Sequence, residues 1–119
     1  METVPLEYML LITEREDHFT DFTKEQWDVL DERHRVFAKQ IVDAGAEIVF
    51  SDPLAAPEPQ SRFTPTADGV LVTDGPFAET KEVVLGYYKI RVESAEIARE
   101  LAALCPTAGY VDLRRVGLG

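Results

Sequence analysis

The sequence predicts an α+β protein in which two helices cover one face of an antiparallel sheet. Short runs rich in apolar and β-branched residues alternate with two segments whose apolar residues recur every three or four positions. The order is strand, helix, strand, then a hairpin insertion after the second strand, then strand, helix, strand. Two split units of this kind form a ferredoxin-like sandwich. The length of 119 residues fits one domain with one core, over residues 1–119.

The first strand is predicted at residues 7–12, an apolar run without a helix cap. The charged residues 13–22 are expected to form a loop. Thr23 then begins a helix as its N-cap, and Gln26 completes a capping box three residues later. Gly45 is expected to end this helix. One apolar face of the helix is formed by Trp27, Leu30, His34, Phe37, Ile41 and Ala44.

The middle of the chain predicts a second strand at residues 47–50 and then the insertion. Prolines make residues 52–69 an extended excursion, with residues 62–64 as a candidate edge strand. Asp68 and Gly69 form the signal of a tight hairpin turn, and an apolar strand follows at residues 70–72.

The last part of the chain predicts a strand, a helix and a strand. Residues 86–92 have strong β character. Ser94 caps a helix whose apolar face contains Ile97, Leu101 and Leu104, and Pro106 ends it. Residues 110–116 alternate apolar and charged side chains, as in a strand with one buried face. With both helices on one face of the sheet, the other face needs a cover, and a second copy of the chain would supply it. We therefore expect a homodimer.

Composition narrows the classes of function. A net charge of −10 argues against nucleic-acid binding, which needs a basic stripe. The sequence contains neither a long apolar run nor a signal-peptide pattern, so we expect a cytoplasmic protein without a membrane partner. Two isolated histidines and the single Cys105 give no metal-ligand spacing, and no nucleotide-binding motif is present. We expect neither a metal nor a cofactor.

His34 is the first candidate for chemistry, because its position on the apolar stripe turns its ring toward the sheet. One interpretation is a core histidine bonded to a backbone carbonyl. The other is a general acid or base, whose pKa burial and a neighbouring carboxylate would tune.

Asp74 is the second candidate and lies in the string TDGPFAETKE at the end of an apolar strand. Its carboxylate either closes an Asx-turn or faces a cleft, and the two interpretations are compatible. Phe77 is expected to pack under the loop. Glu79, Lys81 and Glu82 form either a hydrated charge cluster or an acid and a cation that contact a polar substrate.

The chain resembles the YCII-related family, in the branch characterised by a DGPF motif. The resemblance is carried by residues 8–12, by His34 in its helix, by the string from Val72 to Glu82, and by residues 86–88 and 109–116. It implies a ferredoxin-like fold that pairs into a dimeric α+β barrel. Relatives are similar to muconolactone isomerases, and a dehydrochlorinase member is described with a helix His paired with an Asp. Other relatives are encoded beside, or fused to, extracytoplasmic-function sigma factors.

Two functional hypotheses follow. In the first, the protein is a cofactor-free lyase or isomerase, or a small-molecule-binding protein, in which His34 takes a proton and Asp74 orients it. Tyr8 or Lys81 would then steady an oxyanion, with Phe77 and Glu79 beside the substrate. In the second, the chain is a non-catalytic regulatory or interaction module with a sigma factor as partner.

Overall fold

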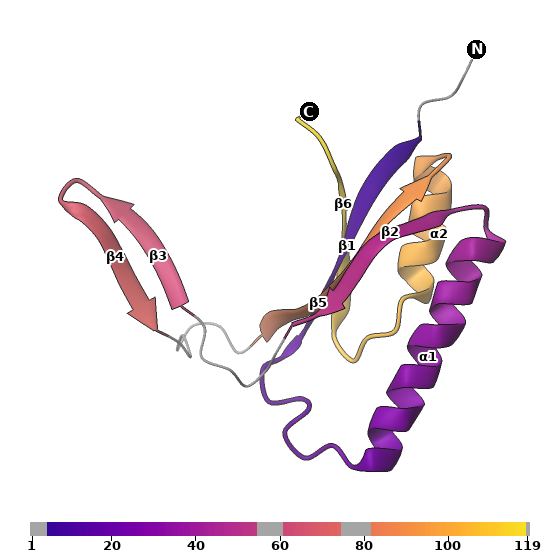
Figure 1. The fold of residues 1–119 in the computed structure, drawn as a ribbon, viewed down its shortest axis with the longest axis horizontal. Helices are drawn as coiled ribbons and strands as arrows, with labels where there is room; N and C mark the ends of the chain where they lie inside the picture. The colour runs from indigo at the N-terminus through magenta and orange to yellow at the C-terminus, as the bar shows by residue number, and fades with distance from the viewer. Residues whose placement is uncertain (1–4, 55–60, 75–81, 119) are drawn as a thin grey trace.

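A computed structural model of the protein describes residues 5–54, 61–74 and 82–118, and Figure 1 gives its arrangement. The described elements are β1 (Leu6–Arg15), α1 (Lys24–Asp43), β2 (Glu47–Pro53), β3 (Ser61–Thr66), β4 (Gly69–Asp74), β5 (Glu82–Val92), α2 (Ala95–Leu104) and β6 (Tyr110–Arg115). No helix within these residues is long and apolar enough to cross a membrane.

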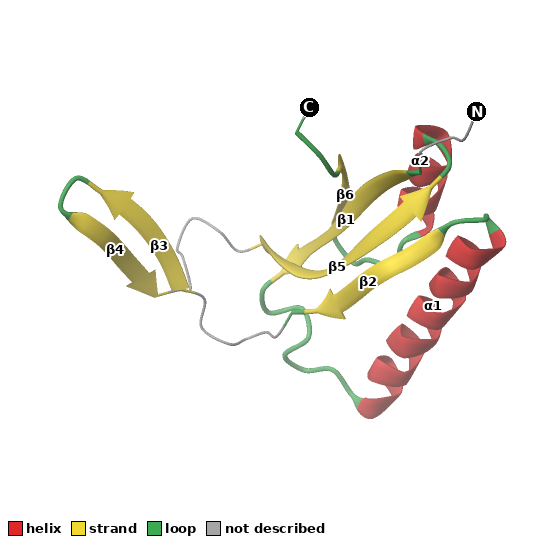
Figure 2. Cartoon of the chain, turned by 45° about the horizontal axis from the view of Figure 1, so that its top comes forward, coloured by secondary structure: helices red, strands yellow, loops and turns green. Residues whose placement is uncertain are grey.

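Four strands form one antiparallel sheet in the order β2-β5-β1-β6, and both helices lie on one side of it (Figure 2). The core lies between this face and the helices, where Phe37 and Ile41 of α1 and Leu101 of α2 are almost fully buried. The strands contribute the side chains that alternate toward the helices, such as Leu10 and Ile90. This arrangement confirms the predicted ferredoxin-like α+β fold.

Both predicted helix starts are confirmed in atomic detail. The Thr23 hydroxyl accepts from the Gln26 backbone N–H at 3.2 Å, and the Gln26 side-chain oxygen accepts from the Thr23 N–H at 2.8 Å. The Ser94 hydroxyl caps α2 by accepting from the Ile97 N–H at 3.2 Å. Gly45 follows α1 with φ of +77°, a conformation that glycine adopts without strain.

The first strand is longer than the sequence predicts, because β1 continues through Arg15 rather than ending at residue 12. A register shift after Ile12 lets residues 13–15 pair with the start of β5 at Glu82. Pairing with a neighbouring strand satisfies the backbone even where side chains are charged, so charge alone was a poor boundary signal. As a consequence, Glu14 lies on a strand and is buried.

Three of the residues assigned to apolar helix faces are exposed: Trp27, Ala44 and Leu104. Trp27 is 42% exposed and packs against Phe19 and Phe22, with ring centroids 5.0 Å away in both cases. Leu104, at the end of α2, is also exposed. The helical period selects one face of a helix, but the sheet covers only the part of that face that it reaches.

The face of the sheet away from the helices is mixed rather than apolar. Arg91 bonds both Glu7 at 3.2 Å and Glu47 at 3.1 Å, and the Lys89 ammonium lies 5.2 Å from the Phe50 ring centroid. The sequence predicts a second apolar face that needs a cover. The charged side chains on this face reduce that need. The homodimer stays a prediction.

Strands β3 and β4 form a separate two-stranded sheet and, among the described elements, pack only against each other (Figure 1). Their register pairs Phe63 with Val72 and Pro65 with Val70, which gathers these four side chains on one side. Every residue of both strands is exposed.

Candidate functional site

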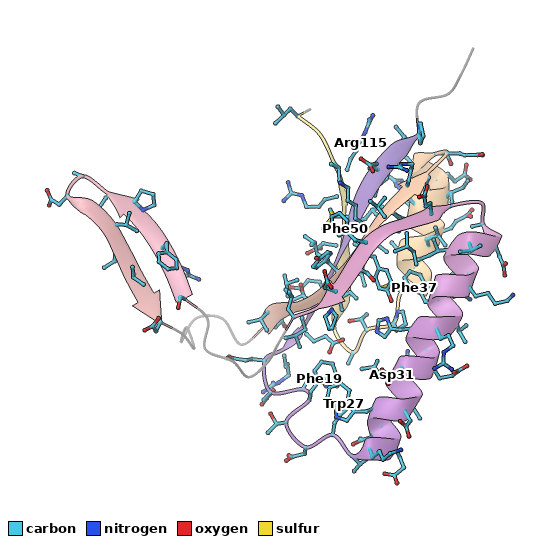
Figure 3. All side chains as sticks on the ribbon, viewed as in Figure 1. Phe19, Trp27, Asp31, Phe37, Phe50 and Arg115 are labelled. Carbon is cyan, nitrogen blue, oxygen red and sulfur yellow. The ribbon has the colours of Figure 1, made fainter. Side chains whose placement is uncertain are left out.

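A cavity of about 610 Å³ lies between the first half of α1, the loop after β1, and the edge formed by β2 and β5. Its lining residues are Ile12, Glu14, Phe19, Trp27, Leu30, Asp31, His34, Ser51, Asp52, Pro53, Leu54, Leu85, Gly86, Tyr87 and Tyr88. Figure 3 shows Phe19 and Trp27 together near the start of α1, with Asp31 further along the same helix. The volume is typical of small-molecule sites.

His34 contacts the sheet at this cavity through one short hydrogen bond. Its Nδ1 lies 2.6 Å from the Tyr88 hydroxyl oxygen, and the two rings are nearly parallel at 15°. His34 precedes the core residue Phe37 by one helical turn, and Tyr88 alternates with Ile90 on the helix-facing side of β5. The helical and strand periods therefore bring the two polar groups together at the border of the core.

Burial sets the protonation of both groups. Desolvation lowers the pKa of His34, and Arg33 lowers it further, while Glu14 and Asp31 act in the opposite direction. Burial, with a contribution from Cys105, raises the pKa of Tyr88 to about 12. At neutral pH the imidazole is therefore neutral and the phenol protonated.

The contact with Tyr88 gives Nε2 of His34 one of two roles. If Nδ1 carries the proton and donates it to the Tyr88 oxygen, Nε2 holds a lone pair and can accept a proton. If Tyr88 donates to Nδ1, Nε2 carries a hydrogen and can donate it. Nε2 makes no hydrogen bond within the described residues and is not among the fully buried polar atoms. It is therefore the nitrogen left for a ligand.

Three carboxylates line the same cavity. Asp31 lies one turn before His34 on α1, and Glu14 lies near the end of β1. Asp52 on β2 accepts a hydrogen bond from the Tyr87 hydroxyl at 2.5 Å, which raises the pKa of Tyr87. These groups give the cavity an acidic lining beside a neutral imidazole.

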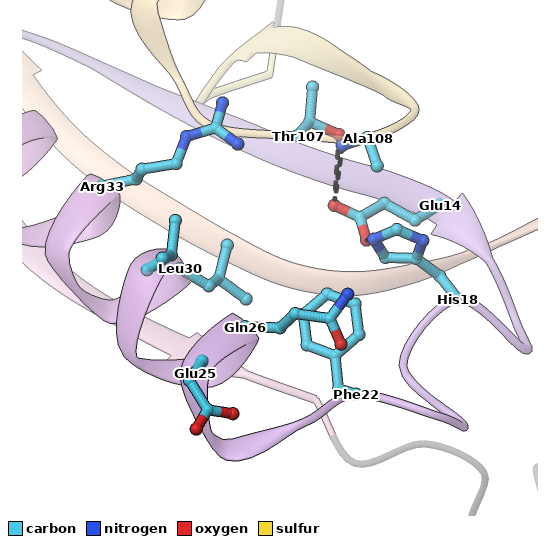
Figure 4. Close-up of a pocket in the computed structure, with 10 residues that line it drawn as sticks. Glu14, His18, Phe22, Glu25, Gln26, Leu30, Arg33, Thr107 and Ala108 are labelled. Atoms are coloured by element: carbon cyan, nitrogen blue, oxygen red, sulfur yellow. Dashed lines mark hydrogen bonds and ion pairs between the residues drawn. The ribbon is translucent and has the colours of Figure 1, made fainter.

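Glu14 also lines a second cavity of about 290 Å³, between α1, the loop after β1 and the turn before β6 (Figure 4). Its Oε1 accepts from the Ala108 N–H at 3.2 Å and from the Thr107 hydroxyl at 3.3 Å. Its Oε2 is buried without a hydrogen bond, 3.7 Å from Nε2 of His18. Gly109 makes this arrangement possible, because a Cβ there would lie 2.1 Å from the Thr13 carbonyl oxygen.

The site residues predicted from the sequence fall in different parts of the molecule. His34 lines the cavity, whereas Tyr8 belongs to the core at 8% exposure and lines neither cavity. Asp74 ends β4 on the separate hairpin, where its Oδ1 accepts from the Ser61 hydroxyl at 2.8 Å. Within one chain, His34 and Asp74 are thus not brought together. Phe77, Glu79 and Lys81 lie outside the described residues.

Several lining residues escaped the sequence analysis. Tyr88 carried a usable signal, because its alternation with Ile90 and Val92 puts it on the same side as the stripe that contains His34. Glu14 was assigned to a loop, and Asp52 depends on a register shift in β2 between Ile48 and Phe50 that no local pattern reveals. Asp31 precedes His34 by one helical turn, but it was not singled out from the sequence.

Other catalytic chemistries have little support in the described residues. No group of three or more His, Cys, Asp or Glu side chains there is arranged to hold a metal ion. Cys105 is buried, and desolvation raises its pKa to about 12, so its thiol is protonated and a poor nucleophile.

The fold and the cavity define the protein as a ferredoxin-like α+β protein with a small-molecule-sized cavity between its first helix and its sheet. Residues 6–116 match the YCII-related domain, and the chain belongs to that family. The chain is also similar to the uncharacterized protein R00369 of Rhizobium meliloti (strain 1021), with 37% identity over 73 residues. That match covers 50% of this chain and 59% of the relative, so it spans less than two-thirds of the relative's length.

Proposed function

We propose that the His34 cavity binds a small molecule and that His34 moves a proton on it without a cofactor, as a lyase or an isomerase does. The observation that carries this proposal is the 2.6 Å contact between Nδ1 of His34 and the Tyr88 hydroxyl at the wall of a 610 Å³ cavity. Tyr88 fixes the ring, and Nε2 is left for the ligand.

The proposed step uses the tautomer in which Nδ1 donates to Tyr88. Nε2 then accepts a proton from an acidic C–H of the substrate, and the imidazolium forms. In an isomerase the same proton returns to a different carbon, whereas in a lyase the electron pair expels a leaving group. The lowered pKa of His34 supports the first half of this cycle, because the base is neutral at pH 7.

Binding is tested by a thermal-shift screen of the purified protein against phenolic and lactone compounds, with His34→Ala beside the wild type. We expect at least one compound to raise the melting temperature of the wild type and to have a smaller effect on the variant. Proton transfer is then tested by following exchange of substrate hydrogen for deuterium in D₂O. Equal shifts in both proteins, and no exchange above that of buffer, would overturn the proposal.

The predicted partnership of Asp74 with His34 is proposed for a homodimer, in which the hairpin of one chain would reach the cavity of the other. Supporting it are the exposed apolar side chains of the hairpin, among them Phe63 and Val72, because an isolated two-stranded sheet is marginal in water. Sedimentation should then give twice the chain mass of 13.3 kDa. Asp74→Asn should weaken ligand binding as His34→Ala does, and unchanged binding would remove Asp74 from the site.

A second candidate function, a regulatory module that binds a sigma factor, rests on the same exposed hairpin. Phe63 is 66% exposed and Val72 is 52% exposed, which suits a surface that docks on a partner. Purified sigma factor should then bind the wild type and His34→Ala equally, and lose affinity for Phe63→Ser/Val72→Ser. Equal binding by the hairpin variant would exclude this docking surface.

A further inference from the structure

The charged side chains among the described lining residues of the His34 cavity are all acidic, although Arg33, next to His34 in the chain, is close enough to lower the pKa of His34. Glu14, Asp31 and Asp52 line the cavity, and among the described lining residues there is neither a lysine nor an arginine. Glu14 is 5% exposed, and its carboxylate contacts Ala108, Thr107 and His18 on the side of the second cavity, so Asp31 and Asp52 are the carboxylates left for a ligand of the His34 cavity. The chain as a whole carries a net charge of −10, which adds to the negative potential. An anionic ligand would be repelled here, and a cation attracted.

One wall of the cavity is aromatic and is not used by the core. The rings of Trp27 and Phe19 lie 5.0 Å apart and are tilted by 32°, and Figure 3 shows them side by side. Trp27 is 42% exposed, so part of its ring is available to a ligand. Tryptophan is the side chain that binds cations most strongly through its ring face, and it also stacks on planar ligands.

Resting on the proposed function of the same cavity, we propose that its ligands are small arylalkylamines, in which an aromatic ring carries a short alkyl chain that ends in a positively charged ammonium group. The ring of the ligand packs on Trp27 and Phe19, and its ammonium group donates hydrogen bonds to Asp31 and Asp52. The cavity volume of about 610 Å³ accommodates a ring with a short alkyl chain. His34, being neutral, adds no opposing charge.

Trp27 makes the proposal directly measurable. It is the single tryptophan of the chain and lines the cavity, so its fluorescence reports on occupancy of this site. The probes are 2-phenylethylamine, 2-phenylethanol and 3-phenylpropanoate, which share a ring and a short chain but carry a positive, a zero and a negative charge. We expect the amine to bind about tenfold more tightly than the carboxylate, with the alcohol between them.

Two variants and a matched control locate the charge recognition. Asp31→Asn and Asp52→Asn should each weaken binding of the amine several-fold and leave binding of the alcohol unchanged. Asp28→Asn is the control, because Asp28 lies on the same helix but pairs with Lys24 at 3.0 Å and does not line the cavity. Circular dichroism and urea unfolding of each variant verify that it is folded.

The outcomes separate this inference from the proposed function. If 3-phenylpropanoate binds as tightly as the amine, or if both aspartate variants bind the amine like the wild type, the inference is wrong. If either result is obtained while His34→Ala still weakens binding of 3-phenylpropanoate, the proposed small-molecule site stands without the preference for amines. If no probe changes the Trp27 fluorescence, small arylalkylamines are excluded as ligands.

Discussion

The Nδ1 atom of His34 lies 2.6 Å from the hydroxyl oxygen of Tyr88, although 54 positions separate the two residues in the chain. The contact joins α1 to β5 at the edge of the core, where Tyr88 also meets the Phe37 ring edge-to-face at 5.1 Å. A polar contact at such a border fixes the histidine more firmly than packing alone, because each partner is desolvated and satisfied by the other.

Tyr88→Phe tests the contribution of this contact. Removal of the hydroxyl leaves Nδ1 of His34 without its partner, so we expect the free energy of unfolding to fall by about 1 kcal/mol. Urea unfolding at pH 7 measures it. The matched control is Tyr87→Phe, whose hydroxyl bonds Asp52 at the surface and whose loss should cost less. Equal losses in the two variants would mean that the His34–Tyr88 bond contributes no more to the free energy of unfolding than a hydrogen bond at the surface.

The stability of the protein should depend on pH through His34. Desolvation lowers its pKa in the folded state below the ordinary value of 6.5, so near pH 6 the unfolded chain binds more protons than the folded one. The stabilisation is therefore complete above pH 6.5 and is lost as the pH falls through 6.5 toward the folded-state pKa. Between pH 5 and pH 8, the free energy of unfolding should rise less steeply with pH in His34→Gln than in the wild type. Identical slopes would contradict a lowered pKa of His34 in the folded state.

Local signals in the sequence predicted the helices and strands well, because each helix cap and each strand pattern depends on residues that are close together in the chain. Thr23 and Gln26 cap each other within one turn, and the apolar alternation of β6 needs only its own residues. The site is different, since it depends on contacts between distant elements. His34 was predicted from its helical stripe, but its partner Tyr88 follows from the β1–β5–β2 pairing, and Asp52 from a shifted register.

The same distinction explains Asp74. The sequence placed Asp74 at the end of the apolar strand of the hairpin insertion, and it left an Asx-turn and a cleft carboxylate open for its side chain. The observed register pairs Asp74 with Ser61 across that hairpin, whose strands have no described neighbour except each other. The Asp-Gly signal at residues 68–69 predicted the hairpin, but no local signal shows where the hairpin lies relative to the main sheet.

Gly109 is a position where side-chain volume should not be tolerated. A Cβ there would lie 2.1 Å from the Thr13 carbonyl oxygen and 3.1 Å from the Glu14 Cα, and both are backbone atoms that cannot rotate away. We expect Gly109→Ala to lower the free energy of unfolding by at least about 2 kcal/mol, because the turn before β6 must move off β1. Gly86→Ala is the control, since its nearest contact, the Asp52 carbonyl oxygen, would be at an ordinary 3.5 Å. A Gly109→Ala protein as stable as Gly86→Ala would contradict this close approach.

Glu14→Gln should preserve stability where Glu14→Ala does not. In the glutamine variant the side-chain oxygen can still accept from Ala108 and Thr107, and the new amide N–H₂ replaces the buried Oε2 that has no partner. That amide can donate toward Nε2 of His18, now 3.7 Å from Oε2, and the cost of burying a charge disappears.

We therefore expect Glu14→Gln to unfold at the same urea concentration as the wild type or at a higher one, at pH 7. Glu14→Ala removes the acceptor of two hydrogen bonds and should lose about 2 kcal/mol. If Glu14→Gln were as damaging as Glu14→Ala, the negative charge itself would be stabilising, and the expectation would be wrong. Because Glu14 also lines the His34 cavity, a stable Glu14→Gln protein with weakened 2-phenylethylamine binding would show that its charge contributes to ligand recognition rather than to folding.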